Sequence, residues 1–209
     1  PEHFVVSLSW YLTPRHYKMV NYFIAMYSGS MLLISFPNIN YLSGTLKITP
    51  QRFLYFSIVT QSAWILKPVY GFISDTIYPF KSRMKFYLVV LPLFQIVISV
   101  FLILVLYSET EYYGAFMGLV TFIFFCTGFA DALGEGMTAT ITKMELRLSD
   151  LKPREEIGKT FAGDIEKRSI GNYVIYRFAV RACTSYLGGF LATEIKIEYV
   201  YAIQLVFPL

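Results

Sequence analysis

Charged residues, cysteine and histidine are all scarce in this chain of 209 residues. Asp, Glu, Lys and Arg make up only 15% of it, whereas soluble domains have about 25%. The two cysteines, Cys126 and Cys183, lie in apolar segments and have no cysteine or histidine neighbour at metal-ligand spacing. The low charge argues against a soluble protein, and the isolated cysteines argue against a disulfide framework or a zinc site.

Signatures of catalysis and of nucleic-acid binding are also missing. No P-loop, Ser-His-Asp set or metal-ligand cluster is visible in the sequence. The net charge of +4 is modest, and no basic stripe on a soluble fold accompanies it. We therefore predict no catalytic residue, no metal ion, no cofactor and no nucleic-acid partner, and we do not expect an enzyme.

Long apolar stretches are abundant instead: 56% of the residues are hydrophobic and 18% are aromatic. Because a membrane helix needs about 20 mostly apolar residues, these stretches predict an all-α, polytopic transmembrane helical bundle in contact with the lipid bilayer. The predicted spans are 17–39, 51–74, 86–107, 113–143, 170–193 and 199–209, the last of them incomplete. An interfacial segment at 1–16 precedes them, and a hydrophilic, cytoplasmic-type loop at 144–169 separates the fourth from the fifth.

The basic residues are distributed unevenly between the two ends of these spans. Most of the 18 lysines and arginines fall in the N-terminal segment, in the loop between the second and third spans, and in 144–169. The opposite end has only Lys47, Arg52 and Lys196. By the positive-inside rule the basic end is cytoplasmic, or faces the matrix or stroma of an organelle. The membrane can be the plasma membrane, the mitochondrial inner membrane or a plastid membrane.

The segment 67–87, KPVYGFISDTIYPFKSRMKFY, closes the second span and opens the third. Gly71 would let two helices approach, and Asp75 lies where a helix end leaves the membrane. Arg83 and Lys85 could reach back to Asp75, forming a charge clamp that holds one gate conformation. The alternative is an ordinary basic loop between two helices.

This segment also resembles known transporters. Gly-x-x-x-Asp followed by Arg-x-Lys is similar to the loop signature of the major facilitator superfamily. Lys-Pro-x-Tyr-Gly-x-x-Ser-Asp with a later Arg-x-x-x-Tyr, preceded by Trp64, resembles the folate–biopterin transporter family. The resemblance implies the six-helix N-terminal half of a major-facilitator-type transporter. Since the chain begins at Pro1 and ends in an apolar run, we expect a C-terminal half of the same chain as a partner.

Asp131 and Glu135 are carboxylates within the fourth predicted span. Their spacing of four places them on one face of a helix. An ionised group in the bilayer costs at least a few kcal/mol, so it needs a partner or a water-filled cavity. Asp-Ala-Leu followed by this glutamate again resembles the family, although 126–129 lacks the second aspartate usual there. The pair is predicted either as a substrate or proton-coupling site or as a structural ion pair.

Three cations also lie within predicted spans. Arg177 and Arg181 are four residues apart and share a helix face, where they would repel each other without a nearby anion. The carboxylates or an anionic solute could supply that anion, and we expect at least one arginine to pair with the carboxylates. Lys67 precedes Pro68 and could pair with Asp131 or bind a solute carboxylate. We favour a third alternative for Lys67, that it extends to the basic end of the membrane.

The resemblance implies a secondary active transporter of a small folate-like or pterin-like anion, acting as a proton symporter by alternating access. A different class stays open: a transporter-derived structural subunit of a larger organellar membrane complex, without transport activity. A channel is less favoured because no selectivity-filter motif is visible.

Overall fold

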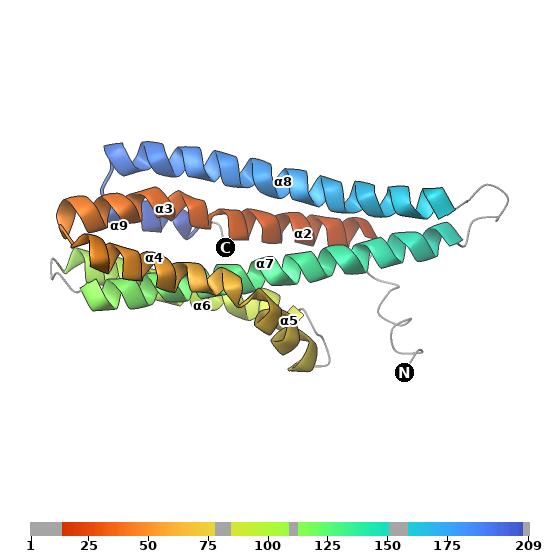
Figure 1. The fold of residues 1–209 in the computed structure, drawn as a ribbon, viewed down its shortest axis with the longest axis horizontal. Helices are drawn as coiled ribbons and strands as arrows, with labels where there is room; N and C mark the ends of the chain where they lie inside the picture. The colour runs from red at the N-terminus through yellow and green to blue at the C-terminus, as the bar shows by residue number, and fades with distance from the viewer. Residues whose placement is uncertain (1–13, 78–84, 109–112, 151–158, 207–209) are drawn as a thin grey trace.

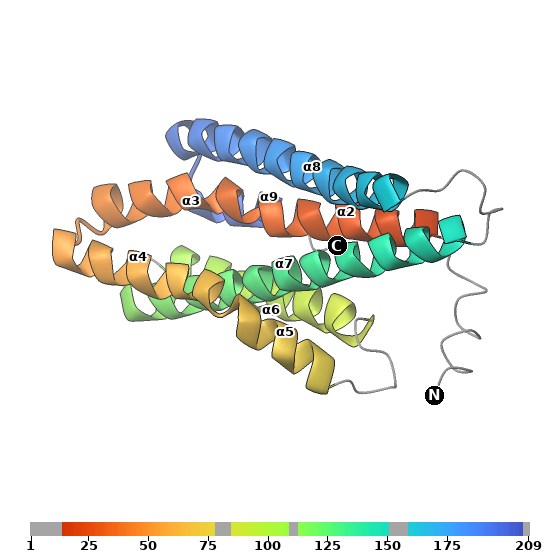
Figure 2. The same cartoon turned by 45° about the vertical axis from the view of Figure 1, so that its right-hand side comes forward.

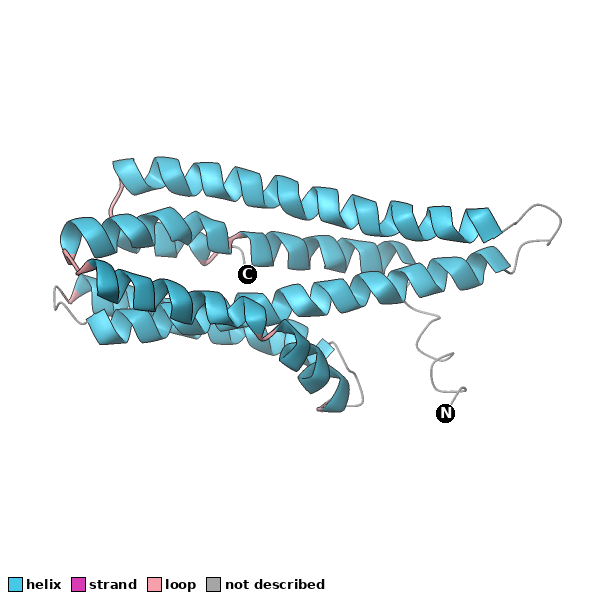
Figure 3. Ribbon diagram, viewed as in Figure 1, coloured by secondary structure: helices cyan, strands magenta, loops and turns pink. Residues whose placement is uncertain are grey.

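The computed structural model describes residues 14–77, 85–108, 113–150 and 159–206, and every regular element in these ranges is a helix (Figures 1 and 3). In chain order the elements are α2 (Pro14–Gly29), α3 (Met31–Asn40), the π-helical turn η1 (Tyr41–Thr45), α4 (Pro50–Ile65), α5 (Lys67–Thr76), α6 (Lys85–Tyr107), α7 (Tyr113–Asp150), α8 (Lys159–Glu194) and α9 (Ile197–Gln204). The interfacial segment predicted at 1–16 lies outside the described residues, apart from the start of α2.

The predicted span 51–74 consists of two helices with a break between them. The Oγ1 atom of Thr49 caps the start of α4 by accepting a hydrogen bond from the backbone nitrogen of Arg52, at 3.5 Å. The helix ends before Leu66, and α5 then begins at Lys67, with Pro68 in its first turn. Because proline has no backbone N–H, it is tolerated at a helix start but interrupts a helix interior. The axis of α5 turns away from that of α4 at this point (Figures 1 and 2).

Helix α7 is the centre of the bundle and packs against α2, α4, α5, α6 and α8 (Figures 1 and 2). Its buried side chains cover a broad face of the helix, because many of them are direct neighbours in the sequence, such as Ile123 and Phe124. They include Phe116, Val120, Ile123, Thr127, Ala130, Leu133, Met137 and Ile141. This central position brings any charged side chain of α7 close to several other helices.

Helix α6, in contrast to the central helix α7, lies at the periphery of the bundle. One face is buried and the other exposes large apolar side chains, which suits contact with lipid. The exposed set includes Val89, Leu93, Phe94, Val97, Phe101 and Leu104. Such a surface is too apolar for a helix that faces water on that side.

Among the residues that the structure describes, three helical stretches are long and apolar enough to cross a membrane: Lys18–Thr45, Phe86–Tyr107 and Tyr113–Met144. They overlap the predicted first, third and fourth spans, while the other three spans stay predictions. α4 and α5 are each short because of the break at Leu66, and α8 carries Arg177 and Arg181. Helices α7 and α8 also extend into the hydrophilic loop predicted at 144–169, up to Asp150 and from Lys159.

Small residues let α8 approach α2 and α3 closely. A Cβ atom added to Gly188 would lie 2.5 Å from the backbone oxygen of Leu33, and one added to Gly29 would lie 2.6 Å from the Cγ1 atom of Val180. Thr184 adds an interhelical bond, since its hydroxyl donates to the backbone oxygen of Gly29 at 2.8 Å. Close approach through small residues is the usual basis of helix packing in membranes.

We expect Gly188→Ala to destabilise the bundle by about 1–3 kcal/mol, because the new methyl group would collide with the backbone of α3. Gly189→Ala is the matched control: an added Cβ atom there meets nothing within 4 Å in the described part of the chain, so the change should be neutral or slightly stabilising. Thermal denaturation of both variants in detergent measures the difference. Equal melting temperatures would show that α3 and α8 do not pack at Gly188.

Candidate functional site

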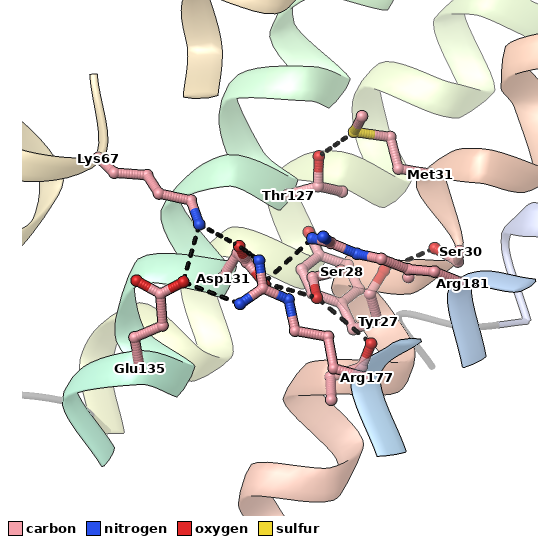
Figure 4. A network of polar contacts seen from close by, with 12 residues as sticks. Tyr27, Ser28, Ser30, Met31, Lys67, Thr127, Asp131, Glu135, Arg177 and Arg181 are labelled. Carbon is pink, nitrogen blue, oxygen red and sulfur yellow. Dashed lines mark hydrogen bonds and ion pairs between the residues drawn. The ribbon is translucent and has the colours of Figure 1, made fainter. Parts of the chain in front are cut away.

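Five charged side chains from three helices meet beside α7 (Figure 4). Asp131 and Glu135 come from α7, Lys67 from the first residue of α5, and Arg177 and Arg181 from α8. The structure thus brings together the two carboxylates and the three cations that the sequence places within its spans. We call these five residues the charge cluster.

Asp131 is the buried centre of the charge cluster, with 0% of its side chain exposed. Its Oδ2 atom lies 2.5 Å from Lys67 Nζ and 2.6 Å from Arg177 Nη2. Its Oδ1 atom lies 3.4 Å from Arg181 Nη2 and accepts a hydrogen bond from the Ser28 hydroxyl at 3.2 Å. Both oxygens therefore have donors, as an ionised carboxylate needs when it is removed from water.

Glu135 lies one turn further along α7 and is much less enclosed, with 48% of its side chain exposed. Its Oε1 atom accepts hydrogen bonds from Lys67 Nζ at 2.9 Å and from Arg177 Nη1 at 2.8 Å. The guanidinium of Arg177 therefore bridges the two carboxylates through its two terminal nitrogens. The predicted placement of both carboxylates on one helix face is confirmed.

The expectation that Lys67 extends to the basic end is wrong. The break at Leu66 places Lys67 at the start of α5, beside α7, where its ammonium pairs with both carboxylates. The two arginines also both pair with Asp131, whereas the sequence favoured this for one of them. Buried carboxylates attract the nearest cations because the alternative is an unpaired charge in a low-dielectric region.

Trp64 is a residue of this site that the sequence analysis used only for the family resemblance. Lys67 Nζ lies 5.0 Å from the centre of its ring, and Arg181 Cζ lies 5.1 Å from it. Both distances are within the range of cation–π attraction. The spacing of three between Trp64 and Lys67 is the signal that could have indicated contact between them. Ser28 gives no comparable signal, because its bond to Asp131 spans 103 residues.

A cavity of about 330 Å³ adjoins the charge cluster between α2, α3, α4, α7 and α8. Ser28 and Arg181 belong to its lining and also contact Asp131. The remaining lining residues are Met31, Leu32, Ser35, Asn38, Ile39, Phe53, Phe56, Ser57, Thr60, Gln61, Trp64 and Phe124. The wall is therefore mixed, with aromatic rings, small polar groups and a single ionised side chain.

The charge clamp predicted at 71–85 is only partly described. Among the described residues, a Cβ atom at Gly71 would meet nothing within 4 Å, so this part of the chain provides no close helix contact there and the predicted approach of two helices at Gly71 stays a prediction. Asp75 is exposed near the end of α5. Arg83 and the side chain of Lys85 lie outside what the structure describes, so their pairing with Asp75 stays a prediction.

A different contact holds the end of α5. The hydroxyl group of Tyr87, on α6, donates a hydrogen bond to the backbone oxygen of Ile77 at 2.5 Å. This oxygen belongs to the residue that follows α5, where backbone oxygens lack a partner within the helix.

Nothing in the described ranges groups three His, Cys, Asp or Glu side chains closely enough to share a metal ion. The side chains that donate hydrogen bonds to buried Asp131 and half-buried Glu135 are those of lysine, arginine and serine residues. The arrangement can therefore bind or release protons and exchange ion-pair partners, and it can offer guanidinium groups to an anion.

Comparison with known proteins gives one family. A family model described as the BT1 family matches residues 29–151. The match covers more than half of the chain and includes Lys67, Asp131 and Glu135, and it ends before α8. Searches of the curated proteins and of the solved structures gave no match.

We expect Asp131→Ala to destabilise the folded protein by about 3–5 kcal/mol, because it leaves three cations with one carboxylate. Glu135→Ala should cost at most about 1 kcal/mol, since Glu135 is half exposed and water can replace it. The two losses of stability are compared by measuring the melting temperatures of both variants and of the unaltered protein in the same detergent. A larger loss for Glu135→Ala would contradict the central role of Asp131.

Proposed function

Because this chain belongs to the BT1 family of folate–biopterin transporters, we propose that it carries a small folate-like or pterin-like anion across a membrane by proton-coupled alternating access. The family and the apolar helices make it an integral membrane protein. The observation that carries the proposal is the charge cluster: five ionised side chains lie inside a bundle whose outer helices suit lipid.

The composition of the charge cluster favours an anionic solute. Three cations face two carboxylates, so one positive charge is not compensated within the cluster. An excess positive charge in a partly buried site raises the affinity for anions. Arginine is also suited to carboxylates, because its planar guanidinium group can donate two parallel hydrogen bonds.

Glu135 is the residue of the charge cluster best placed to carry the coupled proton. It is half exposed, whereas Asp131 is fully enclosed by four donors. A proton on Glu135 removes one of two carboxylates and leaves two positive charges uncompensated. Proton binding then strengthens anion binding, and by thermodynamic linkage anion binding strengthens proton binding to the same degree.

Alternating access requires contacts that form in one state and break in the other. The charge cluster ties α5 and α8 to α7, and Lys67 stands directly after the break between α4 and α5. The cations are partly exposed, at 14–22% of their side chains, so water can replace the carboxylates when helices separate. In the major facilitator superfamily, to which the family resemblance points, two halves rock around a site near the membrane midplane.

The proposal is tested by uptake into vesicles that contain the full-length protein. We expect labelled folate or biopterin to accumulate when the outside is acidic relative to the lumen, and accumulation to stop when a protonophore removes the gradient. Protein-free vesicles give the background. Failure of folded protein to accumulate either compound would contradict the proposal and favour the structural-subunit alternative.

The variant Glu135→Gln tests whether proton coupling can be lost while movement of the solute across the membrane continues. A neutral glutamine cannot release a proton, so uptake should lose its dependence on the pH gradient, while exchange of internal for external solute continues. Glu194→Gln, which removes an exposed carboxylate at the end of α8, is the matched control and should keep the gradient dependence. Uptake by Glu135→Gln that still follows the gradient would exclude Glu135 as the proton carrier.

A further inference from the structure

The cavity beside the charge cluster contains one ionised group, Arg181, among the lining residues that the structure describes. Arg181 is also the most loosely bound cation of the charge cluster. It reaches Asp131 through a single contact of 3.4 Å, whereas Lys67 and Arg177 make contacts of 2.5–2.9 Å to both carboxylates. Its guanidinium group therefore has donors to spare, and it can bind an anion in the cavity without disturbing the shorter ion pairs.

Helix α4 presents a polar and aromatic stripe to the same cavity. Phe53, Ser57 and Gln61 follow one another at a spacing of four, and Trp64 continues the stripe, so all four lie toward one side of the helix. Gln61 is exposed on the part of α4 that lies within the predicted membrane span. An amide that faced lipid would lose its hydrogen bonds at a cost of several kcal/mol for each unpaired group, so this stripe suits a polar occupant.

A second helix supplies an unpaired donor to the cavity. Asn38 lines it, is only 1% exposed, and uses its Oδ1 atom to accept a hydrogen bond from the Tyr201 hydroxyl at 2.6 Å. Its Nδ2 atom is buried and has no hydrogen-bond partner among the described residues. Buried amide donors are nearly always paired in folded proteins. Gln95 and Gln204 also have unpaired Nε2 atoms, but of these three residues only Asn38 lines the cavity, so a ligand atom there is a candidate partner of its nitrogen.

We infer that this cavity is the solute subsite and that it selects a flat aromatic ring bearing an anionic group, with the anion on Arg181 and the polar ring edge on Gln61 and Asn38. Phe53, Phe56 and Phe124 supply aromatic walls for such a ring. The volume of about 330 Å³ is at the lower end of ligand sites. The inference rests on the proposed function and adds the residues that distinguish anionic from neutral solutes.

Equilibrium binding to the purified full-length protein tests this subsite with two probes, labelled folate, which has carboxylates, and labelled biopterin, which has the ring without them. We expect Arg181→Gln to weaken folate binding about tenfold or more, the loss of a hydrogen-bonded ion pair, and to leave biopterin binding within about twofold. Gln61→Leu should weaken binding of both probes to a similar degree, because the ring edge is common to them.

Two variants outside the cavity are the matched controls. Arg52→Gln removes a cation that lies over the Tyr113 ring, 5.9 Å from its centre, and Gln51→Leu removes an exposed amide at the start of α4. Both should bind the two probes like the unaltered protein. If Arg181→Gln does not fold, Arg181→Lys replaces it, and we expect a smaller loss of folate affinity with unchanged biopterin affinity.

The outcomes separate this inference from the function on which it rests. Equal losses of folate and biopterin in either Arg181 variant, or no loss in any cavity variant, would overturn the subsite while leaving transport standing. If the unaltered, folded protein binds and transports neither probe, the proposed function itself fails. Selective loss of folate at Arg181 with a common loss at Gln61 supports the subsite.

Discussion

The enclosed carboxylate of Asp131 is the constraint on which the rest of the structure depends. An ionised group with no exposure needs counter-charges, and these come from residues 46 and 50 positions later in the chain and from the start of α5. The pairing therefore fixes where α5 and α8 lie against α7. Close packing at Gly29 and Gly188 permits the same position of α8. Electrostatic and steric requirements thus specify one arrangement of helices.

The charge cluster is buried enough to hold defined ion pairs, and it is also hydrated enough for these pairs to separate. Asp131 is buried, but the cations around it and Glu135 keep contact with water. Fully buried pairs are expensive to separate, and fully exposed pairs contribute little. The intermediate exposure lets a proton or an anion alter the balance between paired and separated states. The break at Leu66 adds a place where α5 can move relative to α4.

The sequence predicts those features that depend on local spacing. Described helices overlap every predicted span, although 51–74 is divided at Leu66 and α9 ends at Gln204, and three of the helical stretches are long and apolar enough to cross a membrane. Asp131 and Glu135 share a face because four residues make about one helical turn. Features that depend on distant segments were predicted only in part: pairing of an arginine with the carboxylates was expected, but Lys67 was expected at the basic end of the membrane. The partners of Lys67 lie more than 60 residues away, and an added Cβ atom at Gly71 would meet nothing within 4 Å among the described residues. The lining of the cavity likewise combines residues from distant helices, which no local pattern shows.

Unequal charge is the strongest physical reason to assign the charge cluster a function. An ion-pair network that served only to hold helices together would be most stable with equal numbers of cations and carboxylates, and apolar packing often replaces such networks at no loss of stability. Here a third cation, Arg181, faces a cavity and is held at 3.4 Å by a carboxylate that already has two closer partners. Elsewhere in the bundle, the buried polar side chains that the structure describes on α6, Gln95 and Ser99, are neutral. A cation at a cavity without a full counter-charge lowers the stability of the folded protein. The same uncompensated positive charge is what a binding site for an anion requires.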